Sequence, residues 1–275
     1  MTSQAHIATA AEKGRAPADA VSTGSAADFM PPAATLPTLR EAAAKCRGCR
    51  LWTIGTQTVF GEGPETARVV IVGEQPGDSE DREGRPFVGP AGRLLDGALD
   101  AAGIDRGDVY VTNAVKHFNW EPREGTKRRI HKKPGDREIR ACYPWFDEEL
   151  TLIRPEVIVC LGATAAQALL GKDFRVTQAR GRPIQTDRGA TVFATVHPSA
   201  VLRAPPDARE AAERDFFADL RKVGEYLSSG TRRATAGDRE VARPIVPSAD
   251  RPAQRKSSAT ARSRPRSERR PRGNP

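Results

Sequence analysis

The chain has 275 residues, enough for one α/β domain with extensions at both ends. Its formal net charge is +9, and residues 231–275 carry the whole of that excess. No apolar run approaches the roughly 18 residues of a membrane span, and the N-terminus lacks the apolar stretch of a signal peptide. We therefore expect a cytoplasmic protein with no membrane segment, whose four cysteines stay reduced and favour metal binding over disulfides.

Both ends of the chain have a low-complexity composition. Residues 1–36 are rich in Ala, Ser and Pro, which predicts a disordered extension. The folded domain is expected over residues 37–229, followed by a disordered basic tail over residues 230–275. That Arg-, Pro- and Ser-rich tail is either a nonspecific arm for nucleic acid or a solvated extension without function. A specific nucleic-acid site must therefore be argued from the folded domain.

Short apolar segments alternate with helical patterns along that domain. Four β-branched segments predict buried strands, at residues 68–73, 108–112, 156–161 and 191–196. Helical patterns begin near Thr38 and continue at residues 91–102, 136–150, 163–170 and 207–227. This alternation predicts a three-layer αβα fold around a mostly parallel, four-stranded sheet. Ligands bind such sheets at the carboxyl ends of the strands, so the segments that follow the strands are expected to meet.

The four cysteines lie inside the predicted domain. Cys46-x-x-Cys49 offers two thiolates to one centre, and the elements between Cys142 and Cys160 could return both to that centre. Four thiolates suit either tetrahedral zinc or a [4Fe–4S] cluster, and their spacing does not choose between the two. For Cys160, which falls in a strand pattern, the alternative is a buried apolar role without a ligand.

Polar and aromatic residues follow the first strand. Its turn, Gly73-Glu74-Gln75-Pro76-Gly77-Asp78, brings backbone amides near a ligand and places a carboxylate and an amide at its mouth. Phe87 lies in the glycine-flanked segment GRPFVGPAG, either to stack on a planar group or to pack in the core.

The second and fourth strands are followed by further candidates. Asn113 offers a donor and an acceptor together, which suits a pyrimidine edge, although a turn or capping role is the alternative. His197 ends the last strand, where an imidazole is a good donor to developing negative charge or else a structural histidine.

Residues 121–135 are expected to form a long basic loop. Its cations suit a phosphate backbone, and they are Lys127, Arg128, Arg129, Lys132 and Lys133. His131 lies among them, and neighbouring cations favour its neutral, nucleophilic form. The alternative is a solvated loop with an incidental histidine.

Taken together, residues 38–227 resemble the uracil-DNA glycosylase superfamily. The cysteine set, the GE-x-PG turn, GRPFVGPAG and HPS-x-x-LR are similar to those of family 4, the iron–sulfur glycosylases. This resemblance implies a [4Fe–4S] cluster, in place of zinc, on Cys46, Cys49, Cys142 and Cys160. Gln75 and the KRRIH segment, residues 127–131, resemble the UdgX type within the superfamily. In that type the loop histidine becomes covalently joined to deoxyribose after uracil leaves.

The resemblance implies a role for each candidate. His131 would capture C1′ of the sugar in a single turnover, Glu74 would hold the imidazole, and His197 would donate to uracil O2. Uracil would be bound by Phe87, Asn113 and the backbone near Gln75 and Asp78. The flanking phosphates would be gripped by Lys127, Arg128, Arg129 and Arg203. The expected partner of this monomer is uracil-containing DNA, preferably single-stranded. A conventional multi-turnover glycosylase and a non-catalytic nucleic-acid-binding protein are the alternatives.

Overall fold

The computed structural model describes residues 24–230, and the extensions expected over residues 1–23 and 231–275 lie outside that range. The elements that build the sheet and its two covering layers are β1 (Val69–Gly73), α3 (Pro90–Ala101), β2 (Val109–Asn113), α4 (Asp136–Ile153), β5 (Val157–Leu161), α5 (Ala163–Leu170), α6 (Val176–Ala179), β6 (Ile184–Gln185), β7 (Thr191–Thr195), α7 (Pro198–Leu202) and α8 (Pro206–Ser228). The remaining elements are η1 (Ala26–Phe29), α1 (Leu36–Ala43), η2 (Arg50–Thr53), α2 (Asp78–Glu83), η3 (Arg106–Asp108), β3 (Trp120–Pro122) and β4 (Arg129–His131).

The main sheet has the strand order β2-β1-β5-β7-β6. The four predicted strands pair in parallel, while β6 joins β7 in antiparallel fashion at the edge. The expectation of four strands was therefore wrong by one, because a two-residue edge strand leaves no periodic signal in the sequence. Each parallel strand is buried along its whole length, as expected for a sheet covered on both faces.

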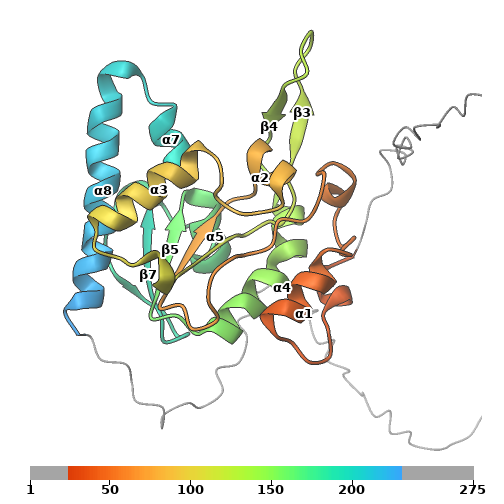
Figure 1. The fold of residues 1–275 in the computed structure, drawn as a ribbon, viewed down its shortest axis with the longest axis horizontal. Coiled ribbons are helices and arrows are strands. Elements are labelled where there is room, and N and C mark those ends of the chain that lie inside the picture. Colours follow the sequence, from red (N-terminus) through yellow and green to blue (C-terminus); the bar gives the residue numbers. More distant parts are fainter. Residues whose placement is uncertain (1–23, 231–275) are drawn as a thin grey trace, which may run out of the picture. The chain divides into compact units, whose positions relative to one another are not determined.

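Helices cover the two faces of this sheet, which confirms the three-layer architecture (Figure 1). On one face α3 and α8 pack through Leu95 and Phe216 against strand residues such as Ile71. On the other face α4 and α5 pack against the alternate strand residues, as Phe146 does. Within residues 24–230, no helix is long and apolar enough to cross a membrane.

A third hydrophobic cluster lies beyond α4. It joins η1, α1 and the cysteine-containing segment to the outer side of α4, and Trp145 is buried at its centre. Ala26 of η1 belongs to this cluster, so the folded part extends N-terminally into residues assigned from the sequence to the extension.

The basic segment expected to be a loop forms an antiparallel hairpin instead. Strand β3 pairs with β4, and Trp120 lies opposite His131. The hairpin projects away from the sheet beyond the strand ends (Figure 1). The prediction of a loop was wrong because each strand has only three residues and β3 contains a proline, so no alternation is visible in the sequence.

Candidate active site

The residues predicted to bind a planar ring converge on Gly73, the last residue of β1. A Cβ at this position would clash with Asn113 Oδ1 and would lie 2.9 Å from Phe87 Cζ. Phe87 adopts a left-handed backbone conformation (φ 57°), a rare and strained geometry for a bulky residue, and its ring stacks on His197 at 6.3 Å between centroids. The Asn113 side-chain amide has no hydrogen-bond partner within residues 24–230 and remains available to a ligand.

His197 is held in one tautomer by the start of α7. The backbone N–H of Ser199 donates to His197 Nδ1 at 3.1 Å, so the ring proton of the neutral imidazole lies on Nε2. Burial, together with the charges of Arg203 and His131, lowers the pKa of His197 to about 4. His197 is therefore a neutral donor at physiological pH. The orienting role of Ser199 was missed from the sequence, where it is one residue of the HPS segment.

His131 lies beside the carboxylate of Glu74. Its Nε2 is 3.5 Å from Glu74 Oε1, and its ring lies 5.9 Å from that of Phe118 between centroids. Burial lowers the pKa of His131, the Glu74 carboxylate raises it, and Arg203 lowers it. The lowering effects favour a neutral imidazole, which has the lone pair of a nucleophile.

The side chain of Gln75 braces the base of the hairpin. Its Nε2 donates to the backbone carbonyl oxygens of Asn119 and Lys132, at 3.1 Å each. Its Oε1 accepts from the backbone N–H of Asn119 at 3.2 Å. Gln75 is buried, so the expected uracil-binding contribution at this position is left to its backbone. The side chain instead ties the turn after β1 to the segments that flank His131.

Arg129 anchors β4 to α2. Its guanidinium donates to the carboxylates of Asp78 and Asp81, and it lies over the rings of Phe118 and Trp120. Only 11% of its side chain is exposed, and Asp81 is fully buried. The side chains of Arg129 and Asp78 therefore pair with each other and hold the hairpin, and the expected contribution of the Asp78 backbone to uracil binding stays a prediction. The pKa of Asp78 is lowered, since the ion pairs with Arg82 and Arg129 outweigh the opposing effect of burial.

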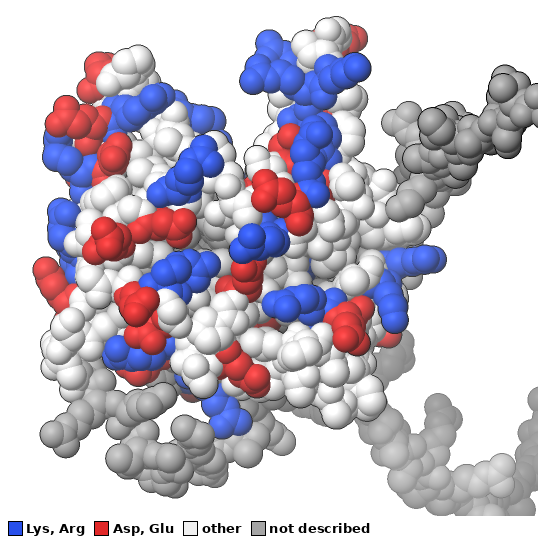
Figure 2. All heavy atoms as spheres, viewed as in Figure 1, with Lys and Arg blue, Asp and Glu red and all other residues white. Residues whose placement is uncertain are grey.

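Lys127 and Arg128 differ from Arg129 in being exposed at the far end of the hairpin. Figure 2 shows blue side chains gathered at the tip of the hairpin. Arg203 is also exposed, at the end of α7, and its charge reaches both site histidines. These three cations remain available to phosphate groups.

The cysteines do not all come together. Cys46, Cys49 and Cys142 share the third hydrophobic cluster, whereas Cys160 packs inside the main sheet with Val72 and Ala194. Burial raises the pKa of Cys142 and the neighbouring thiols Cys49 and Cys46 raise it too, whereas burial alone raises the pKa of Cys160 to about 12. The structure therefore does not bring Cys160 together with the other three cysteines, because its strand is buried between both helical layers.

Near the other three cysteines lie Trp145 and His117, two polar side chains that suit a bound metal centre. No three metal-binding side chains within residues 24–230 converge on the position of a single ion, as zinc would require. Trp145, in the same cluster, has a buried indole N–H that finds no acceptor among the described residues. His117 is buried and follows Lys116, whose backbone N–H donates to Cys142 Sγ at 3.2 Å. His117 was not selected from the sequence because it is an isolated histidine there.

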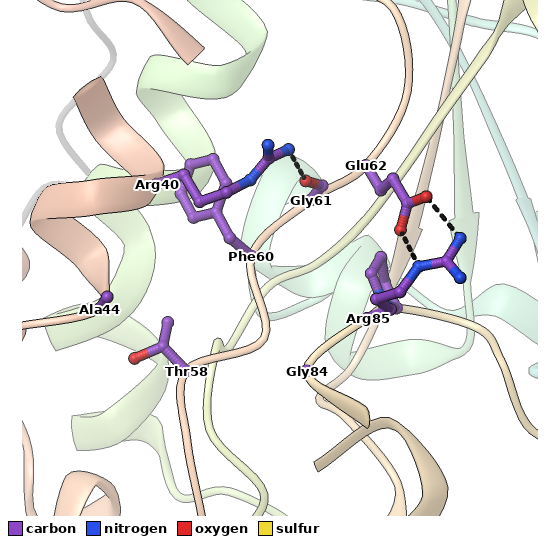
Figure 3. A pocket seen from close by; sticks show the side chains of 9 residues that line it. Arg40, Ala44, Thr58, Phe60, Gly61, Glu62, Gly84 and Arg85 are labelled. Atoms are coloured by element: carbon purple, nitrogen blue, oxygen red, sulfur yellow. Dashed lines mark hydrogen bonds and ion pairs between the residues drawn. The ribbon is translucent and has the colours of Figure 1, made fainter. Parts of the chain in front are cut away.

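A cavity of about 380 Å³ lies beside the third hydrophobic cluster and is lined by Thr58 and Phe60 among other residues (Figure 3). Its two guanidinium groups are already engaged: Arg40 donates to the Gly61 carbonyl, and Arg85 forms a bidentate ion pair with Glu62. Neither imidazole nor the Glu74 carboxylate lines it. The chemistry therefore belongs to the strand ends and not to this cavity.

Fold and site define an α/β protein that gathers an aromatic ring, an amide, a carboxylate and two imidazoles at the carboxyl ends of a parallel sheet. Residues 60–221 match the family model described as Uracil DNA glycosylase superfamily. A type-4 uracil-DNA glycosylase of Thermotoga maritima is 42% identical over 188 residues, covering 68% of this chain and 92% of that protein. The corresponding Archaeoglobus fulgidus protein is 38% identical over 200 residues, covering 70% and 92%. The chain belongs to the uracil-DNA glycosylase superfamily, which confirms the family expected from its motifs.

Proposed function

We propose that this protein is a uracil-DNA glycosylase that cleaves the N-glycosidic bond of deoxyuridine and becomes attached to deoxyribose C1′ through His131. The observation that carries this proposal is the approach of His131 Nε2 to Glu74 Oε1, at 3.5 Å, beside the Phe87, Asn113 and His197 cluster. The activity itself is supported by the type-4 relatives, and the attachment by the resemblance of the KRRIH segment to the UdgX type.

The base would occupy the space over Gly73. Phe87 would stack on uracil, and the Asn113 amide would pair with its polar edge. The Nε2–H of His197 would donate to uracil O2, where negative charge develops as the bond breaks. A preorganised neutral donor of this kind stabilises the transition state without giving up its proton.

The deoxyribose would react on the side of the site that holds Glu74 and His131. The C1′–N1 bond breaks with its electron pair leaving on uracil, which later takes a proton from solvent. The cationic C1′ is stabilised by the Glu74 carboxylate and is captured by the lone pair of the His131 imidazole. Glu74 accepts the proton that the imidazole releases, so charge is balanced and no water is consumed. Because a histidine–sugar bond has no good leaving route, the reaction stops after one turnover.

DNA would enter along the hairpin. Lys127 and Arg128 at its tip, together with Arg203, would contact phosphates on either side of the extruded nucleotide. Single strands are favoured because an unpaired uracil costs less to extrude than one in a duplex.

The experiment is a denaturing gel of the protein with labelled single-stranded DNA that contains one uracil. A heat-stable slow band is expected with uracil DNA and not with a thymine control. His131→Ser should remove the band, while Lys127→Ser, a change in the same hairpin, should retain it at saturating DNA. Free uracil released in molar excess over protein, without the band, would instead establish a conventional multi-turnover glycosylase.

We also propose that Cys46, Cys49 and Cys142 hold a [4Fe–4S] cluster, with His117 as the fourth ligand. A cluster binds each ligand through a separate iron, so its ligands need not converge on one point as they must for zinc. Thr58 Oγ1 donates to the Ala43 carbonyl and lies 3.0 Å from His117 Nε2, which favours a proton on Nε2 and a free lone pair on Nδ1. The Trp145 N–H, which has no acceptor within residues 24–230, supports the same assignment, since it would find one in a cluster sulfide. A cytoplasmic location, where thiols remain reduced, suits such a cluster.

The ligand set is tested by iron content and visible absorbance of purified variants. Cys160→Ala should keep the full iron content, whereas Cys142→Ala and His117→Ala should lose it. Iron that is lost in Cys160→Ala and retained in His117→Ala would overturn this assignment.

A further inference from the structure

Glu74 has a second partner that the proposed chemistry does not use. Thr164 Oγ1 donates a hydrogen bond to Glu74 Oε2, while Glu74 Oε1 faces His131 Nε2 at 3.5 Å. The hydroxyl and the imidazole thus lie at different oxygens of one carboxylate. Thr164 is 3% exposed, and the Glu74 side chain is 22% exposed, so this contact is shielded from water.

The sheet explains why these two residues meet. Glu74 follows β1 and Thr164 follows β5, and these strands are parallel neighbours whose carboxyl ends lie side by side. Gly162 turns the chain between β5 and α5 with a φ of 89°, a conformation that favours glycine. The turn places Thr164 in the first turn of α5, where the helix dipole also favours a nearby carboxylate.

The hydrogen bond has a definite direction. An ionised carboxylate only accepts, so the hydroxyl proton points to Glu74 and restricts its rotation. A carboxylate without this bond could turn about its side-chain torsions and present either oxygen, or neither, to the imidazole. Holding a reacting group at one position is worth a large factor in rate.

We propose that Thr164 is a positioning residue that fixes the Glu74 carboxylate, so that one oxygen is always directed at His131 and at the sugar. This inference rests on the proposed function of Glu74 and deepens it. Thr164 touches neither base nor sugar, and it acts only through Glu74.

The test compares Thr164→Val, which keeps the shape and removes the hydroxyl, with Thr164→Ser, which keeps the hydroxyl. Adduct formation under single-turnover conditions should slow on the order of tenfold or more in Thr164→Val, as expected for a lost hydrogen bond to a charged group. Thr164→Ser should restore most of the rate. Thr151→Val is the matched control, because Thr151 also lies on a helix but its hydroxyl donates to Asp147 O, away from the site.

A second readout separates positioning from simple loss of stability. The groups whose charges act on the His131 imidazole are Glu74, which raises its pKa, and Arg203, which lowers it. A loosened Glu74 raises the pKa less, so NMR titration should give a lower pKa for His131 in Thr164→Val and a restored value in Thr164→Ser. The His131 signal is assigned by its absence in His131→Ser.

The possible failures can be distinguished. An unchanged rate together with an unchanged or raised His131 pKa in Thr164→Val would overturn the positioning role. If the wild-type protein releases uracil without forming an adduct, the covalent proposal fails. The rate of uracil release then tests the role of Thr164, because Glu74 would face the same cationic sugar. Thr164→Val is again expected to slow that release.

Discussion

The base-binding side and the hairpin side of the site are built in different ways. Phe87, Asn113 and His197 follow or adjoin buried parallel strands, and their positions are set by the backbone of the sheet. His131 lies on a two-stranded hairpin of three-residue strands that is held to the domain by side chains, chiefly Arg129 and Gln75. In the proposed function, the first side breaks the glycosidic bond and the second captures the sugar. Changes on the two sides should therefore separate bond cleavage from adduct formation.

The largest effect is expected on the base-binding side. His197→Ala removes the proposed donor to uracil O2 and should reduce uracil release and adduct formation together, by about 100- to 1,000-fold. Single-turnover assays that follow both products measure this. A variant that loses the adduct but releases uracil at the wild-type rate would contradict the shared role of His197.

Loss of the hairpin anchor should have a narrower effect. Arg129→Met leaves the buried Asp81 carboxylate without its cation, and removing one partner of a buried pair typically costs about 3–5 kcal/mol. We expect faster hydrogen exchange in β3 and β4 and a loss of adduct on the order of 10- to 100-fold. Arg82→Met is the control, because Arg82 pairs with Asp78 on the surface. Equal loss of uracil release in Arg129→Met would show that the two sides are not separable.

Acidic pH should affect the hairpin side first. His131 must be neutral to react, and its pKa lies below the ordinary value of 6.5, whereas that of His197 is about 4. Adduct formation is therefore complete above pH 6.5 and declines as the pH falls through the pKa of His131. In His131→Ser, uracil release should persist to lower pH. The rates of both proteins from pH 4 to 8 test this, and identical profiles would assign the decline to another group.

The smallest effect is expected at the hairpin tip. Lys127→Ser removes one exposed cation, which should weaken DNA binding a few-fold at low salt and reduce the slope of log affinity against log salt by about 1. The adduct rate at saturating DNA should remain unchanged. Binding titrations at several salt concentrations measure the slope, and a loss of specificity for uracil in this variant would contradict a phosphate role.

The difference between the strand ends and the hairpin also explains which parts of the site could be predicted from the sequence. β-Branched runs such as residues 156–161 predict strands buried on both faces, and the motifs that follow the strands predict the base-binding residues. The hairpin gave no such signal, because Pro122 and the cations around it are typical of a loop. The anchoring role of Arg129 depends on Asp78 and Asp81, which lie about fifty residues earlier in the chain.

Cys160 and Thr164 show the limits of spacing. Cys160 completes a plausible set of four thiols, but strand pairing places it inside the sheet, among apolar side chains and away from the other three. Thr164 belongs to no chemical motif, and only the adjacency of β1 and β5 brings it to Glu74. The positions of Cys160 and Thr164 both depend on which strands are neighbours in the sheet. No local sequence pattern predicts that strand order.

The most direct test of the central claim is mass spectrometry of the protein after reaction with a short uracil-containing strand. The account predicts a mass increased by that of the oligonucleotide less uracil, with the attachment mapped to His131. Unmodified protein together with released uracil in molar excess would contradict it, and would leave His131 as part of a DNA-binding hairpin.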